Sequence, residues 1–189
     1  MLTIGWDLDG VLYPWHSIVL EYCKINKLIP PETTMKEMWG SPGIFNDQFN
    51  HILRANLVNI PTFYGSAVPS PTVMSVLQEL DKFTKMVYIT RRPIPEAVTV
   101  TRQWVKQLPQ GKNIYISAGS KTALVKWQNC DIYVEDRIDS AKELELITSL
   151  LLLTRSWNEG WQDPGITRIY SLWDVIDYVD YFGQSTKGS

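Results

Sequence analysis

The sequence predicts a doubly wound, Rossmann-like α/β fold with a mainly parallel sheet and a small helical cap inserted after the first strand. Short apolar runs of strand length recur along the chain, and segments with helical periodicity fill the intervals between them. One long stretch after the first apolar run has helical spacing and contains no convincing strand. Strands that alternate with helices are typical of a parallel sheet covered on both faces, and this pattern leads to the expected fold class.

The expected strands are apolar runs, most of which end in polar or turn-forming residues. They are residues 2–6, 86–89, 114–116, 132–134 and 150–153. The expected helices are residues 75–83, 95–107, 122–127 and 140–147, with an amphipathic closing helix near 173–178. In such sheets ligands bind beyond the carboxyl ends of the strands, so the residues that follow each apolar run are the candidates for a site.

The stretch from Tyr13 to about Pro71 interrupts this alternation. Residues 17–27 and 44–57 have the apolar spacing of helices, and prolines mark both edges of the stretch. An insertion placed directly after the first strand would overhang the crevice as a lid. We therefore expect a core of residues 1–13 and 72–183, a small helical cap of residues 14–71 and a flexible tail of residues 184–189.

The composition predicts one principal domain, because 189 residues of which 44% are hydrophobic can build an independent core. The 18 Lys and Arg against 20 Asp and Glu give a formal charge of −2, which disfavours duplex nucleic acid but not a nucleotide-sized ligand. Cys23 and Cys130 are not clustered as in a zinc site or disulfide framework, so we expect buried thiols. Asp7 and Asp9 interrupt the apolar N-terminus, so we expect no membrane partner and a cytoplasmic location; a homodimer is compatible with the sequence.

Two carboxylates, Asp7 and Asp9, follow the first expected strand at the point where the chain turns out of the sheet. Their spacing directs both toward the crevice if the strand loosens there. Taken alone, the pair is equally compatible with turn or capping chemistry. The residues that follow the other strands decide between the two interpretations.

Polar residues also follow the next two expected strands. Thr90, with Arg91 and Arg92 after it, precedes an expected helix, where a hydroxyl and a free N–H can hold a phosphate oxygen. The alternative is a helix cap with solvated arginines. Lys121 precedes the following helix, and the alternative there is an ordinary solvated lysine.

An acidic pair, Glu135 and Asp136, ends a strongly apolar strand. Buried carboxylates are costly without a cation, so the pair suits a hard metal ion. Four strand ends therefore deliver, in chain order, Asp-x-Asp, Thr, Lys and an acidic pair. This ordered set, which spans about residues 2–147, resembles the motifs of the haloacid dehalogenase superfamily, and the fold that the resemblance implies agrees with the one expected from periodicity.

The resemblance implies a phosphohydrolase, because in this superfamily the second aspartate marks enzymes whose leaving alkoxide needs a proton. It implies that Asp7 is the nucleophile and becomes a phosphoaspartate, and that Asp9 is the general acid and base. Thr90 and Lys121 would hold the transferring phosphoryl group and neutralise its charge.

The same resemblance implies Mg²⁺ as the cofactor. Its ligands would be the Asp7 carboxylate, the backbone carbonyl of Asp9 and Asp136, with Glu135 binding directly or through water. The superfamily often has Asp-Asp at this position, so the share of Glu135 stays open.

A closer resemblance is to the 5′(3′)-deoxyribonucleotidases, which share a small helical cap after the first motif and a compact Lys-Thr segment before an acidic pair. Residues 119–122, 134–137 and 151–158 carry this resemblance. It implies a deoxynucleoside or nucleoside monophosphate as the substrate. The side chains then available for substrate binding are Arg91 and the cap aromatics Trp39, Phe45 and Phe49, which could stack on a base.

Other functions stay open at this point. The core chemistry would be unchanged in a phosphatase for another small monoester or for a terminal phosphate on nucleic acid. A binding protein that kept the fold without turnover would be expected to have lost Asp7, Asp9 or the metal carboxylate, and the sequence retains them. His16 and His51 have no triad-like partner in the sequence, and we assign them no role.

Overall fold

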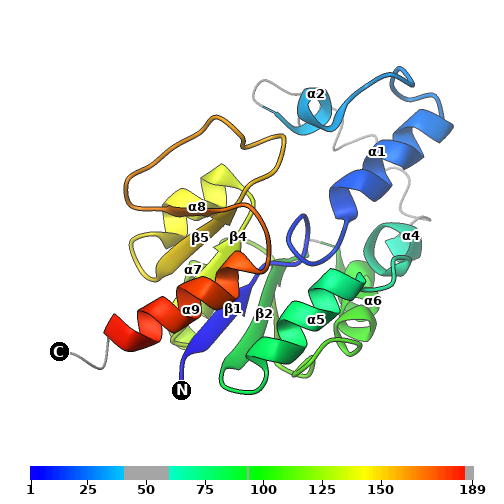
Figure 1. Cartoon of the computed structure of the whole chain (residues 1–189). Coiled ribbons are helices and arrows are strands. Elements are labelled where there is room, and N and C mark those ends of the chain that lie inside the picture. Colours follow the sequence, from blue (N-terminus) through cyan, green and yellow to red (C-terminus); the bar gives the residue numbers. More distant parts are fainter. Residues whose placement is uncertain (41–59, 93, 186–189) are drawn as a thin grey trace.

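The computed structural model describes residues 1–40, 60–92 and 94–185, and its centre is a six-stranded sheet (Figure 1). Every neighbouring pair of strands is parallel, and the strand order is β3-β2-β1-β4-β5-β6. The strands are β1 (Thr3–Trp6), β2 (Lys85–Arg91), β3 (Ile114–Ser117), β4 (Ile132–Glu135), β5 (Ser149–Leu153) and β6 (Thr167–Ile169). The order reverses between β1 and β4, and in such sheets the crevice outside the carboxyl ends of those two strands is the ligand site.

Helices cover both faces of the sheet. One face packs against α5 (Pro71–Leu80), α6 (Pro95–Val105) and α9 (Asp174–Ser185), and the other against α7 (Thr122–Trp127) and α8 (Ile138–Leu144). Alternate residues of β2 show the division, because Met86 and Tyr88 belong to the first core cluster whereas Val87 and Ile89 belong to the second. A parallel sheet buried on both faces is the expected fold class, which the structure confirms.

Three further helices follow β1 and lie at one end of the sheet (Figure 1). They are α1 (Trp15–Ile25), α2 (Met35–Trp39) and α4 (Ile60–Gly65). Their buried side chains form a cluster separate from the two core clusters, made of Val19, Leu20, Cys23, Ile29, Met38 and Phe63. Helix α2 begins at a capping box in which Thr34 and Glu37 satisfy each other's backbone N–H groups. The predicted helical insertion after the first strand is thus present.

The observed elements differ from the expected ones mainly at their ends. Helix α5 begins at Pro71 and not at residue 75, because Ser70 caps it by accepting from the Val73 N–H at 3.2 Å. Strand β6 was not expected, since three residues are too few for a periodic pattern. Helix α9 continues to Ser185, into the expected tail, while the expected helix at 44–57 and residues 186–189 lie outside the described residues.

Two simpler expectations can also be compared with the structure. Cys23 and Cys130 are buried and unpaired, as expected for thiols of this kind. Among the helices that the structure describes, none has the length and apolar character needed to cross a membrane.

Candidate active site

Asp7 lies directly after β1, at the point where the strand order reverses. Its backbone N–H continues the sheet ladder by donating to the Val134 carbonyl at 3.0 Å. The Asp7 side chain is buried, and its Oδ1 lies 2.7 Å from the Lys121 Nζ. Burial alone would raise the pKa of Asp7, but the Lys121 ammonium more than offsets this effect and the pKa lies below its ordinary value. Asp7 is therefore an ionised carboxylate.

A tight turn after Asp7 carries the chain from the sheet toward α1. The Leu8 carbonyl accepts hydrogen bonds from three successive backbone N–H groups, at 3.2, 2.9 and 2.7 Å. Within the turn Gly10 has a φ of +81°, and a Cβ on it would lie 2.1 Å from the Asp136 Oδ2. Glycine is required here by backbone conformation and by space, and it allows the turn to lie against Asp136.

Lys121 occupies the N-cap position of α7 and is 6% exposed. Its Nζ lies 2.7 Å from the Asp7 Oδ1 and 2.9 Å from the Glu135 Oε2. Burial alone would lower the pKa of the ammonium, but the two carboxylates raise it above its ordinary value. The solvated-lysine alternative is therefore wrong, because Lys121 is a buried cation between two acidic side chains.

Glu135 is fully buried, and protein donors occupy both of its carboxylate oxygens. Oε2 accepts from the Lys121 Nζ, and Oε1 accepts from the backbone N–H groups of Asp136 and Arg137 at 3.1 and 3.2 Å. Burial and the nearby Asp7 charge raise the pKa of Glu135 to about 7. Its hydrogen bonds fix both Lys121 and the turn that follows β4.

Asp136 is also fully buried, but its bonding is incomplete. Oδ2 accepts from the Trp157 indole N–H at 3.1 Å, whereas Oδ1 has no hydrogen-bond partner among the described residues. Burial, followed by the neighbouring Glu135 and Asp7 charges, raises the pKa of Asp136 well above its ordinary value. An unsatisfied carboxylate oxygen in a buried site is costly unless a cation binds it.

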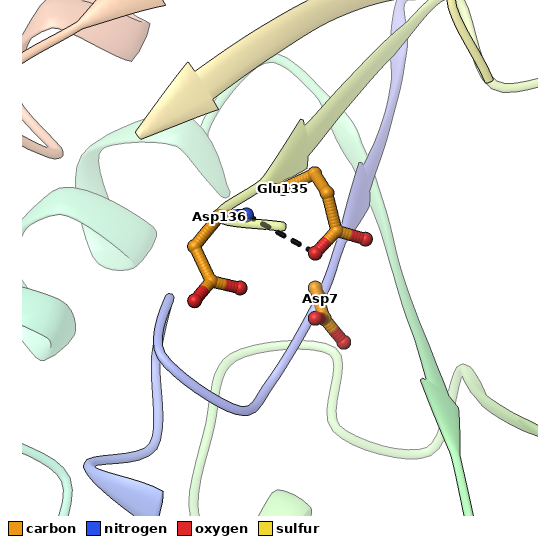
Figure 2. A group of neighbouring side chains, drawn as sticks. All are labelled: Asp7, Glu135 and Asp136. Carbon is orange, nitrogen blue, oxygen red and sulfur yellow. Dashed lines mark hydrogen bonds between the residues drawn. The ribbon is translucent and has the colours of Figure 1, made fainter. Parts of the chain in front are cut away.

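The three carboxylates gather around a common space at the carboxyl ends of β1 and β4, as Figure 2 shows. One ligand atom from each of Asp7, Glu135 and Asp136 lies within 4.8 Å of the others. Oxygen donors at this spacing, one of them without a partner, fit a hard divalent cation. Because Glu135 already bonds Lys121 and two backbone N–H groups, Asp7 and Asp136 are the better placed ligands.

Asp9 is not a member of this cluster and forms an ion pair with Arg92. The Arg92 Nη1 and Nη2 lie 2.6 and 2.9 Å from the two Asp9 carboxylate oxygens, in a bidentate arrangement. Burial raises the pKa of Asp9, and Arg92 offsets part of the rise. The side chain of Asp9 remains 22% exposed, so it can reach a bound ligand.

Thr90 lies within β2, so the alternative of a helix cap at this residue is wrong. Its buried Oγ1 accepts a hydrogen bond from the Arg92 Nη1 at 2.9 Å. Arg91 is exposed, because successive strand residues point to opposite faces and Thr90 and Arg92 share the other one. The structure thus brings Arg92 to Asp9 and Thr90, whereas no described contact joins Arg91 to the carboxylates.

Sequence reasoning missed the residues that surround Asp136. His16 was given no role, but it stacks on Trp157 with 4.3 Å between ring centroids, and its Nδ1 lies 4.0 Å from Asp136. Burial lowers the pKa of His16 to about 3, so the ring is neutral. Asn158 donates to the Asp136 carbonyl at 2.7 Å, and Arg155 donates to the Gly10 carbonyl at 2.8 Å. The resemblance of residues 151–158 was the available signal for this wall of the site.

Aromatic side chains of α1, α2 and α4 pack against one another. Trp39 contacts Trp15, with 5.2 Å between ring centroids, and Trp15 stacks on Tyr64 at 6.2 Å and 26°. Phe45 and Phe49 lie outside the described residues. A cavity of about 500 Å³ has Gly10, His16, Arg155 and Trp157 among its lining residues, and Asp7 does not line it.

Solved hydrolases share this fold. A haloacid dehalogenase-like hydrolase of Streptococcus pneumoniae has a TM-score of 0.64 at 15% identity, covering 95% of this chain and 98% of that protein. Another, from Xanthomonas campestris, has a TM-score of 0.63 at 10% identity, covering 100% and 99%. A D,D-heptose 1,7-bisphosphate phosphatase of B. bronchiseptica, solved with magnesium and phosphate, has a TM-score of 0.54 at 9% identity, covering 95% and 98%.

A sequence relative is also known. A nucleotidase of Clostridium acetobutylicum is 21% identical over 185 residues, which cover 95% of this chain and 94% of that protein. No protein-family model matches the chain. At these identities the similarities establish a common architecture. The chain has the fold of the haloacid dehalogenase-like hydrolases, which confirms the fold that the resemblance implied.

Proposed function

We propose that this chain is a divalent-metal-dependent phosphomonoester hydrolase in which Asp7 forms a phosphoaspartate. The observation that carries the proposal is the buried cluster of three carboxylates, two of which contact Lys121, in which the Asp136 Oδ1 has no partner among the described residues. Such a cluster is expensive to bury for structure alone, and it lies where ligands bind in this class of sheet.

The proposed cofactor is Mg²⁺, held by the Asp7 carboxylate, Asp136 and the backbone carbonyl of Asp9. Hard oxygen donors suit this ion, and when bound it would neutralise charge on the phosphate and orient it. Glu135 would act chiefly on Lys121, with at most a water-mediated contact to the ion. The heptose bisphosphate phosphatase that shares this fold was solved with magnesium and phosphate, which is compatible with this assignment.

The chain's own residues have distinct roles in the proposed reaction. An Asp7 oxygen forms a bond to phosphorus while the bond to the leaving oxygen breaks, and Asp9 donates a proton to that oxygen. Asp9 then takes a proton from the water that attacks the phosphoaspartate, which releases phosphate, restores the Asp7 carboxylate and leaves Asp9 protonated for the next cycle. Lys121 offsets the charge of the phosphoryl group, and the Thr90 hydroxyl donates to one of its oxygens.

The pKa directions agree with these roles. The lowered pKa of Asp7 keeps the nucleophile ionised, whereas the raised pKa of Asp9 helps the carboxyl to carry a proton. Lys121 stays protonated because the carboxylates beside it raise its pKa.

For the substrate we propose a nucleoside monophosphate, with the 5′(3′)-deoxyribonucleotidases as the family of reference. The nucleotidase relative supports this choice, as do the aromatic rings of Trp15, Trp39 and Tyr64 in the expected cap of residues 14–71. Stacking of a base on an aromatic ring is worth about 1–3 kcal/mol. A phosphatase for another small monoester would use the same core and different cap contacts.

The experiment measures phosphate release from deoxynucleoside and ribonucleoside monophosphates and from sugar phosphates, with Mg²⁺ or with EDTA, for the wild type and Asp7→Asn. We expect release that needs Mg²⁺, is strongest on nucleotides and is lost in Asp7→Asn. Release from sugar phosphates alone would replace the substrate class and keep the mechanism. Release that persists in EDTA or in Asp7→Asn would contradict the mechanism, and binding without any release would favour a binding protein.

A further inference from the structure

Arg92, the ion-pair partner of Asp9, is a buried cation. It is 4% exposed, and its guanidinium contacts three parts of the fold. The Nε donates to the Thr101 hydroxyl on α6 at 2.8 Å, which fixes the orientation of the guanidinium plane. The two terminal nitrogens then reach Asp9 in the turn after β1 and Thr90 in β2.

The contacts of Arg92 fix the orientation of the Asp9 carboxylate and of the Thr90 hydroxyl. A bidentate pair restricts a carboxylate in both position and rotation, which a single hydrogen bond does not do. For Thr90, the Arg92 Nη1 occupies a lone pair of the hydroxyl oxygen, so the hydroxyl proton is left to donate elsewhere. Arg92 thus holds Asp9 in place and directs the Thr90 proton away from itself.

Arg92 is also connected to the cap side of the molecule. The Tyr64 ring of α4 lies over the guanidinium, with 4.5 Å from the Arg92 Cζ to the ring centroid. Helix α4 packs against α6, and Phe63 beside Tyr64 is buried in the cluster that α1 and α2 form. A displacement of α4 would therefore change the surroundings of Arg92 before those of Asp7 or Lys121.

From these contacts we infer that Arg92 is a positioning residue, which orients Asp9 for proton transfer to the leaving group and couples that orientation to α4 through Tyr64. This inference rests on the proposed phosphohydrolase function. It assigns the effect of Arg92 to departure of the leaving group and not to binding of the phosphate. The two effects can be separated by changing the leaving group.

The test compares Arg92→Lys with the wild type on p-nitrophenyl phosphate, whose leaving group needs little protonation, and on a nucleoside or alkyl monophosphate, whose alkoxide needs a proton. General acid catalysis contributes about 10²–10⁴-fold, so kcat/KM on the alkyl ester, which reports formation of the phosphoaspartate, should fall by about 10- to 100-fold. On p-nitrophenyl phosphate the loss of kcat/KM should stay within about 3-fold, whereas hydrolysis of the phosphoaspartate is common to both esters and affects kcat on both alike. Arg102→Lys, on the exposed side of α6, is the matched control and should change neither ester.

A double-mutant cycle makes the test specific. In an Asp9→Asn background, Arg92→Lys should lower kcat/KM on the alkyl ester by less than about 3-fold, because its effect acts through Asp9. Equal losses of kcat/KM on both esters, or additive losses in the cycle, would overturn the inference. A wild type that releases phosphate from neither ester would overturn the proposed function itself.

Substitutions of Tyr64 provide a second test, which leaves the Arg92–Asp9 ion pair in place. Tyr64→Leu should lower kcat/KM on the alkyl ester by about 3- to 10-fold and leave kcat/KM on p-nitrophenyl phosphate unchanged, whereas Tyr64→Phe should keep both activities. Thermal unfolding of each variant checks that it is folded. An unchanged ester preference in a folded Tyr64→Leu would remove α4 from the inference, and it would do so even if Arg92→Lys failed to fold.

Discussion

At the scale of single residues, Gly10 combines two constraints, a positive φ and a position against Asp136. We predict that Gly10→Ala lowers kcat/KM for the phosphomonoester by about 100-fold or more, because the Asp136 carboxylate must move to make room for the Cβ. The free energy of unfolding should fall by about 1–3 kcal/mol. Gly160→Ala is the control, since a Cβ there meets nothing within 4 Å and the φ is ordinary. Equal behaviour of the two variants would contradict the account.

The acidic cluster gives a second prediction at this scale, on pH. Folding raises the pKa of Glu135 from 4.5 to about 7, so its stabilising contribution is complete below pH 4.5 and is lost as the pH rises through about 7. Asp136 shifts in the same direction. The effect of His16 on the free energy of unfolding has the opposite sign. Folding lowers the pKa of His16 from 6.5 to about 3, so the neutral buried ring destabilises the fold at low pH and no longer does so above pH 6.5. Above about pH 6.5, the change of the free energy of unfolding with pH should therefore come from the carboxylates alone.

In EDTA we expect Tm to fall by about 2–4 °C between about pH 6.5 and about pH 8. The rise in Tm that Mg²⁺ causes should be larger at the higher pH, because the ion competes with protons for the same carboxylates. Asp136→Asn should abolish most of the Mg²⁺ effect, whereas Glu96→Gln, on the exposed face of α6, should leave it unchanged. A Mg²⁺ effect that is independent of pH would count against the cation site.

At the scale of elements, the start of α5 is encoded by two adjacent residues. Ser70 followed by Pro71 is a helix start, and the Ser70 side chain accepts from the Val73 N–H. We predict that Ser70→Ala lowers the free energy of unfolding by about 1 kcal/mol, measured by urea titration, with activity per folded molecule unchanged. Ser75→Ala, at an exposed position inside the same helix, should be neutral or slightly stabilising. A neutral Ser70→Ala would remove the cap from the account of α5.

Strands whose residues are apolar along their whole length were predictable, and β1, β4 and β5 lie within a residue of their expected bounds. Strand β6 was not, because at the edge of the sheet its Thr167 is exposed and its Arg168 bonds the loop around Asn158. Its position depends on tertiary contacts that no short window of sequence contains.

At the scale of the whole molecule, the sequence predicted which strand ends meet, because parallel strands bring their carboxyl ends to one edge of the sheet. Asp7, Lys121 and Glu135 are therefore together, as the ordered motifs indicated. The partner of Asp9 was not predictable, because Arg92 is 83 residues away and the adjacent Arg91 is chemically identical. Successive residues at the end of β2 point to opposite faces of the sheet, so only one of the two arginines can turn inward. The hydrophobic pattern of the sequence does not show which residue of such an adjacent pair faces inward.

The most direct test of the central claim is mass spectrometry of the chain quenched in acid during turnover of p-nitrophenyl phosphate with Mg²⁺. The account predicts one phosphoryl group on the peptide that contains Asp7, at a higher level in Asp9→Asn because hydrolysis of the intermediate is slowed, and none in EDTA. Turnover without any phosphorylated peptide in either protein, or a phosphoryl group on a residue other than Asp7, would contradict it.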